Sequence, residues 1–147
     1  MQSPLQILFI DDHIGLLEGI SSVLQAKDSR LRFFLASSTE EAERILRANS
    51  GIALIVADLN IDGEDGIKAI SLLKAIRDVP CVVYSMYADL FHVKAALAAN
   101  VQGYVSKKSP TDELLSAIHA ASEGKTFYCT ETAQTVSKLF VKYPPPI

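Results

Sequence analysis

Five short apolar runs, separated by stretches with helical periodicity, constrain the fold of this sequence most strongly. They cover residues 7–10, 33–36, 52–57, 81–84 and 101–105. Most of these runs are continuously apolar instead of alternating, which is the pattern of a strand that is covered on both faces. Strands of this kind with helices between them form parallel sheets. The sequence therefore predicts an α/β fold around a five-stranded parallel sheet.

The stretches between the runs carry start signals for helices. Ser38 followed by Glu41 predicts the beginning of the second helix, and Ser109 with Pro110 marks the entry to the fifth. Strand and helix alternate five times, so right-handed crossovers predict an open, doubly wound, flavodoxin-like sheet. The ligand site of such a sheet lies beyond the carboxyl ends of its strands.

The pattern changes after residue 124. Residues 130–142 place apolar side chains at helical spacing and predict an extra C-terminal helix, and a proline run at 144–146 favours a stiff linker. We therefore expect one domain over residues 5–124, and a C-terminal helix with a proline-rich linker over residues 125–147. We also expect the natural chain to continue past Ile147 into another domain.

Composition excludes several classes of protein. A net charge of −3 without any basic run argues against nonspecific binding to nucleic acid. Cys81 and Cys129 are the only cysteines, which favours a reducing, cytoplasmic location over a disulfide-rich secreted one. The N-terminus lacks the features of a signal peptide, and no apolar run approaches the roughly 18 residues of a membrane span.

Polar side chains follow four of the five runs. They are Asp11 and Asp12, Asp58 with Asn60, Ser85, and Lys107. Three carboxylates brought together repel one another unless a cation lies among them. Oxygen ligands suit Mg²⁺, or Mn²⁺, better than zinc. A lysine opposite such a metal would neutralise an anion, and a phosphoryl group between them is the simplest interpretation.

These residues in this order resemble the receiver domain of two-component response regulators. The resemblance covers residues 5 to about 124 and rests on Asp11-Asp12, Asp58-Leu59-Asn60-Ile61 with Gly66, Ser85, and Gly103-Tyr104-Val105-Ser106-Lys107. It implies the CheY-like fold. Asp11-Asp12-His13 and the stretch from Gly103 to Gly124 are similar to the subfamily with a C-terminal helix-turn-helix output domain, the NarL/FixJ/LuxR type. This implies control of transcription through a DNA-binding domain that is absent from this chain.

The resemblance also implies a role for each polar residue. The carboxylate of Asp58 accepts a phosphoryl group from the phosphohistidine of a sensor histidine kinase or phosphotransfer protein. Lys107 pairs with the phosphoryl oxygens. The metal is held by Asp12 directly, by Asp11 mainly through water, by Asp58, and by the backbone carbonyl of Asn60.

A switch is implied as well. The hydroxyl of Ser85 moves toward the new phosphate while the ring of Tyr104 turns inward, and the phosphorylated chain forms a homodimer. Met86 directly follows the switch hydroxyl, where a small residue is common in the family. Its bulk is expected to slow the access of water and lengthen the life of the phosphoryl group.

Other interpretations stay open at this stage. Asp11 or Asp12 alone would be an ordinary helix cap, Tyr104 alone a core residue, and His13 a loop residue beside the site instead of a metal ligand. A hydrolase with Asp58 as nucleophile would need a general acid two residues on, where this chain has Asn60. A stand-alone or degenerate receiver that serves only as a protein-interaction module is the other alternative.

Overall fold

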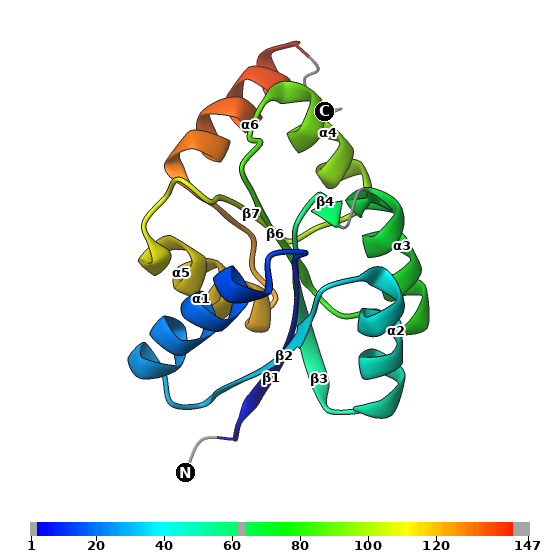
Figure 1. Cartoon of the computed structure of the whole chain (residues 1–147). Coiled ribbons are helices and arrows are strands. Elements are labelled where there is room, and N and C mark those ends of the chain that lie inside the picture. The colour runs from blue at the N-terminus through cyan, green and yellow to red at the C-terminus, as the bar shows by residue number, and fades with distance from the viewer. Residues whose placement is uncertain (1–2, 62–63, 143–147) are drawn as a thin grey trace.

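The computed structural model describes residues 3–61 and 64–142, which alternate between strand and helix (Figure 1). The strands of the main sheet are β1 (Leu5–Ile10), β2 (Leu31–Ala36), β3 (Ile52–Ala57), β6 (Cys81–Ser85), β7 (Gly103–Ser106) and β8 (Phe127–Tyr128). They are parallel and lie in the order β2-β1-β3-β6-β7-β8. The predicted α/β fold with a parallel sheet is confirmed.

The sheet has one strand more than the sequence predicted. β8 pairs with the edge strand β7, with Gly103 opposite Phe127 and Tyr104 opposite Tyr128. Two residues are too few to show any periodicity, so the pairing depends on the tertiary contact and not on a local pattern. The expected number of five strands is therefore corrected to six in the described part of the chain.

Helices cover both faces of the sheet (Figure 1). They are α1 (Ile14–Lys27), α2 (Thr39–Ala48), α3 (Gly66–Ile76), α4 (Leu90–Ala98), α5 (Thr111–Ser122) and α6 (Thr130–Lys142). The predicted cap of α2 is present, because the backbone N–H of Glu41 donates to Ser38 Oγ at 3.2 Å. None of the helices in the described ranges is long and apolar enough to cross a membrane.

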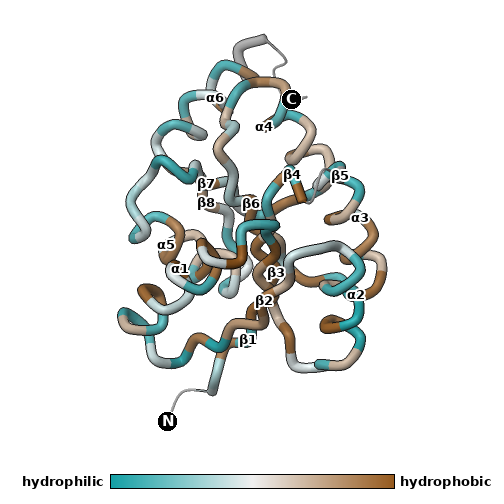
Figure 2. The backbone as a smooth tube through the Cα atoms, viewed as in Figure 1, coloured by the Kyte–Doolittle hydropathy of each residue, from teal (hydrophilic) through white to brown (hydrophobic). Residues whose placement is uncertain are grey.

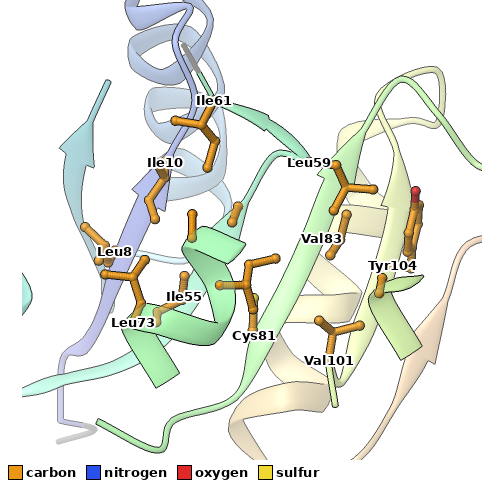
Figure 3. Close-up of a cluster of buried hydrophobic side chains, with 14 of the residues drawn as sticks. Leu8, Ile10, Ile55, Leu59, Ile61, Leu73, Cys81, Val83, Val101 and Tyr104 are labelled. Carbon is orange, nitrogen blue, oxygen red and sulfur yellow. The ribbon is translucent and has the colours of Figure 1, made fainter. Parts of the chain in front are cut away.

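Alternate residues of the strands enter two different cores, which explains their continuous apolar character. Ile7 and Phe9 of β1 pack with α1 and α5, whereas Leu8 and Ile10 pack with α2, α3 and α4. The apolar residues accordingly concentrate along the central strands (Figure 2). Figure 3 shows Leu8, Ile10 and other members of the second core. Each fully buried side chain of this size contributes roughly 1.5 to 3 kcal/mol.

The C-terminal helix α6 packs on this fold beside α4 and β7 (Figure 1). Its Val136 and Leu139 are 6% exposed and belong to the same buried cluster as Tyr104. The predicted helix over residues 130–142 is confirmed. The expected proline-rich linker falls outside the described residues, and the domain boundary at residue 124 stays a prediction.

A short antiparallel hairpin follows β3 and was not predicted. It pairs β4 (Asn60–Ile61) with β5 (Glu64–Asp65). Gly66, directly after it, lies so close to β3 that an added Cβ would stand 2.5 Å from the carbonyl oxygen of Asp58. Only glycine fits there, and it allows α3 to begin directly beside Asp58.

Candidate functional site

The carboxyl ends of three strands bring two aspartates and a lysine into contact. Asp11 follows β1, Asp58 follows β3, and Lys107 follows β7. Lys107 Nζ lies 2.5 Å from Asp11 Oδ2 and 3.0 Å from Asp58 Oδ2. Asp11 is 1% exposed and Asp58 is 7% exposed. The convergence predicted from the strand ends is therefore present for these three residues.

Mutual pairing keeps the buried groups charged. Burial alone would raise the pKa of Asp11, but hydrogen bonds from Lys107 and from the backbone N–H of His13 hold it below its usual value. Burial likewise favours the neutral form of Lys107, and its hydrogen bonds to Asp11 and Asp58 more than compensate, so that its pKa is raised. The lysine is thus an ammonium ion and Asp11 a carboxylate near neutral pH.

Asp12 stands at the rim of this cluster with His13. The Nδ1 atom of His13 lies 2.9 Å from Asp12 Oδ1 and 3.1 Å from Asp11 Oδ1, and its ring is 72% exposed. The carboxylates of Asp11 and Asp12 and the imidazole bring their ligand atoms within 4.8 Å of one another. Whether His13 is a loop residue beside the site or a metal ligand stays open, because its nitrogen lies among the ligand atoms of both acids, a contact that the sequence did not indicate.

The donors of this cluster suit a small divalent cation. The group whose ligand atoms lie together has two carboxylates, Asp11 and Asp12, and Asp58 adds a third that is joined to Asp11 through Lys107. The single ammonium of Lys107 leaves negative charge in excess. Two of the acids are buried, where that excess is poorly screened by water. Oxygen donors with surplus negative charge fit Mg²⁺ or Mn²⁺. The residues present therefore fit the metal that the sequence predicted.

Asn60 lies next to Asp58, and Ser85 lies next to Lys107. The backbone N–H of Asn60 donates to Asp58 Oδ1 at 3.4 Å. Ser85 is fully buried at the end of β6, and its carbonyl accepts a hydrogen bond from the Lys107 N–H at 2.8 Å. Its Oγ accepts from the N–H of Tyr87 at 3.1 Å. The Ser85 hydroxyl is therefore hydrogen-bonded to the loop that directly follows β6.

Tyr104 belongs to β7, the strand that pairs with the strand of Ser85, and is completely buried. Its hydroxyl donates to the backbone carbonyl of Tyr87. Burial raises the pKa of Tyr104, against the effect of a hydrogen bond with Ser85, so the phenol stays protonated. The ring is turned inward in this structure, and the movement of Tyr104 on phosphorylation stays a prediction. The sequence did not indicate that the Tyr87 carbonyl accepts this hydrogen bond, because every residue has a backbone carbonyl and no side-chain pattern singles one out.

An apolar cavity opens beside the site. It measures about 570 Å³ and is lined by His13, Gly15, Leu16, Met86 and Lys107. Met86 is 49% exposed and lines this cavity together with the lysine. The expected effect of Met86 on the access of water stays a prediction.

Comparison with known proteins identifies the family of this arrangement. Residues 7–119 match the response regulator receiver domain. The methanol utilization control regulatory protein MoxX of Paracoccus denitrificans is 30% identical over 145 residues, which are 96% of this chain and 64% of that protein. This chain therefore spans less than two thirds of the length of that relative.

Solved structures agree with this result. A two-component response regulator of the LuxR family from Aurantimonas sp. SI85-9A1 superimposes with a TM-score of 0.84 at 25% identity, covering 95% of this chain and 99% of that one. RcsB of Salmonella enterica serovar Typhimurium, bound to a promoter, shares the fold with a TM-score of 0.83 at 21% identity, covering 95% of this chain and 70% of that one. The chain belongs to the receiver domain family of response regulators.

Proposed function

We propose that this chain accepts one phosphoryl group on the carboxylate of Asp58 and thereby switches an output function. Receiver domains are phosphoacceptor switches, and they do not turn over an external metabolite. The observation that carries the assignment to Asp58 is its contact with Lys107, 3.0 Å away, at the edge of the sheet where Asp11 also lies. The same set of residues argues against a degenerate receiver, because it retains every charged group that the transfer requires.

The proposed reaction transfers a phosphoryl group from nitrogen to oxygen. An oxygen of Asp58 attacks the phosphorus of a phosphohistidine on a sensor histidine kinase or phosphotransfer protein, and an acyl phosphate P–O bond forms. The P–N bond breaks, and its electron pair returns to the imidazole. Lys107 changes partners from Asp58 to the new phosphoryl oxygens and neutralises their charge. Positioning and charge neutralisation are sufficient for this kind of transfer.

Asp11, Asp12, Asp58 and the carbonyl of Asn60 are the groups that would hold the metal. When bound, a divalent cation such as Mg²⁺ supplies positive charge that offsets the phosphoryl oxygens and the carboxylates. The protein's own contribution is to fix Asp58 between the N–H of Asn60 and the ammonium of Lys107. This holds the acceptor carboxylate in one orientation before a donor arrives.

The output is proposed to lie outside this chain. MoxX is longer than this chain, and RcsB is seen on a promoter. We infer that residues 5–124 form the receiver, that residues 125–147 lead to a helix-turn-helix domain, and that the cytoplasmic protein controls transcription as a phosphorylated homodimer. The alternative is a stand-alone receiver that acts on a protein partner.

Intact mass spectrometry after incubation with acetyl phosphate tests the phosphoacceptor. We expect the wild type to gain one phosphoryl group in the presence of Mg²⁺ and none after chelation. Asp58→Asn should gain none, whereas Asp112→Asn, which removes an exposed carboxylate, should behave as the wild type. A gain that survives Asp58→Asn would overturn the assignment, and steady hydrolysis of a phosphomonoester would favour the hydrolase.

A further inference from the structure

We propose that the imidazole of His13 is a ligand of the divalent cation at the acidic cluster, and that it raises the preference of this site for Mn²⁺ over Mg²⁺. The inference rests on the metal site of the proposed function and adds a nitrogen to its oxygen ligands. The Nδ1 atom of His13 lies 2.9 Å from Asp12 Oδ1 and 3.1 Å from Asp11 Oδ1. The ligand atoms of these three residues all lie within 4.8 Å of one another.

The spacing of these atoms matches that of neighbouring ligands around one cation. The ligands of a small octahedral cation lie about 2.1 Å from it, so adjacent ligand atoms are about 3.0 Å apart. Both distances from His13 Nδ1 are close to this value. A protonated Nδ1 carries one hydrogen, which cannot point fully at two carboxylate oxygens. A cation among the three atoms would contact all of them.

The backbone before α1 turns the His13 ring toward the acids. His13 occupies the N-terminal cap position of α1, but its side chain makes no capping hydrogen bond to the helix. Its backbone N–H donates to Asp11 Oδ1 at 3.0 Å, which is the same oxygen that its ring nitrogen approaches. The ordinary role of a polar side chain at this position, to cap the helix, is therefore not the one that this imidazole performs.

The two oxygens of Asp11 face different partners. Oδ2 lies 2.5 Å from the ammonium of Lys107, whereas Oδ1 faces the His13 imidazole. A cation on the Oδ1 side therefore does not compete with Lys107 for the same oxygen. The His13 side chain is 72% exposed, so its ring loses little hydration when it binds a metal, and water can complete the coordination.

A nitrogen ligand changes the order of metal affinities. Carboxylate, carbonyl and water ligands suit Mg²⁺ and Mn²⁺ alike, whereas imidazole is a ligand of transition metals. The His13 nitrogen should therefore strengthen the binding of Mn²⁺ more than that of Mg²⁺. If His13 only oriented the acids through hydrogen bonds, its removal would weaken both metals equally. Selectivity thus separates a ligand from a residue that merely positions Asp11 and Asp12.

Pulsed electron paramagnetic resonance on the Mn²⁺-loaded chain tests the ligand directly. A bound imidazole nitrogen modulates the electron spin echo of Mn²⁺, and we expect this modulation in the wild type and not in His13→Phe, which keeps a ring and removes its nitrogens. His92→Phe is the matched control, because Nδ1 of His92 also lies against an aspartate, 2.6 Å from Asp89 Oδ1, but outside the cluster. This control should keep the wild-type modulation.

Calorimetric titration with Mn²⁺ and with Mg²⁺, without a phosphoryl donor, gives the second measurement. We expect His13→Phe to bind Mn²⁺ about 10-fold more weakly than the wild type and Mg²⁺ within about 3-fold, and His92→Phe to bind both as the wild type does. Retained Mg²⁺ binding also shows that His13→Phe is folded. If the wild type binds Mn²⁺ without nitrogen modulation, or if His13→Phe weakens both metals equally, His13 is not a ligand and the carboxylate site stands. A wild type that binds neither metal would overturn the proposed metal site together with this inference.

Discussion

The ammonium of Lys107 lies 3.0 Å from Oδ2 of Asp58, although the two residues are 49 positions apart. On the proposed function, the carboxylate of Asp58 is thus already paired with the cation that would neutralise its acyl phosphate. We predict that Lys107→Gln slows phosphorylation by acetyl phosphate about 100-fold, the cost of removing one preorganised donor. The rate of mass gain measures this effect. Lys108→Gln, at an exposed neighbouring lysine, is the control, and an equal loss in both variants would refute the specific role of Lys107.

Asp12 contributes charge to a cluster that already has an excess of carboxylates. We predict that Mg²⁺ stabilises the wild type by up to about 2.7 kcal/mol at 100 times its Kd, because it binds only the folded cluster. In Asp12→Asn this response should be largely lost, and without metal the variant should be at least as stable as the wild type because repulsion with Asp11 is relieved. Thermal unfolding with and without Mg²⁺ measures both effects.

Asp78→Asn is the control for this prediction, since it removes an exposed aspartate outside the cluster. Its stabilisation by Mg²⁺ should match that of the wild type. A full Mg²⁺ response in Asp12→Asn would show that the metal is bound without this carboxylate, and would remove Asp12 from the proposed ligands.

Sequence patterns predicted this fold well wherever the signal is local or periodic. The five apolar runs and the capping pair Ser38 and Glu41 are of this kind. β8 was missed because its two residues become a strand only through pairing with the edge of β7. The hydrogen bond from Thr135 Oγ1 to the carbonyl of Ala88 was missed for a similar reason, because it joins a helix to a backbone carbonyl far away in the chain. Tyr104 was expected as a core residue on spacing alone, and its complete burial confirms this, whereas its switch role stays a prediction.

Asp28 links the end of α1 to α5. Its titration should account for part of the fall in the free energy of unfolding at low pH. Its Oδ2 accepts from Arg30 at 2.9 Å and lies 2.8 Å from His119 Nε2. These hydrogen bonds, that of Arg30 first, hold the pKa of Asp28 far below 3.8. A lowered folded-state pKa stabilises the protein above pH 3.8, and this contribution is lost as the pH falls toward the folded-state value.

We therefore predict that Asp28→Asn costs about 1 kcal/mol at pH 7 and loses less stability than the wild type between pH 4 and pH 2. Urea unfolding at a series of pH values gives both quantities. Asp112→Asn removes an exposed carboxylate that pairs with Lys27, and such a pair contributes little, so its curve should follow that of the wild type. If Asp28→Asn loses as much stability as the wild type between pH 4 and pH 2, Asp28 is not the source of this pH dependence.

Met86 should set the lifetime of the phosphoryl group through its bulk. Its side chain lines the same cavity as Lys107, so on the proposed function it lies near the route by which water could reach an acyl phosphate on Asp58. We predict that Met86→Ala shortens the half-life severalfold without changing the number of phosphoryl groups that are accepted. Loss of the mass gain after removal of acetyl phosphate gives the half-life. Met86→Leu keeps most of the volume and should resemble the wild type, so a short half-life in both variants would assign the effect to sulfur or to folding and not to bulk.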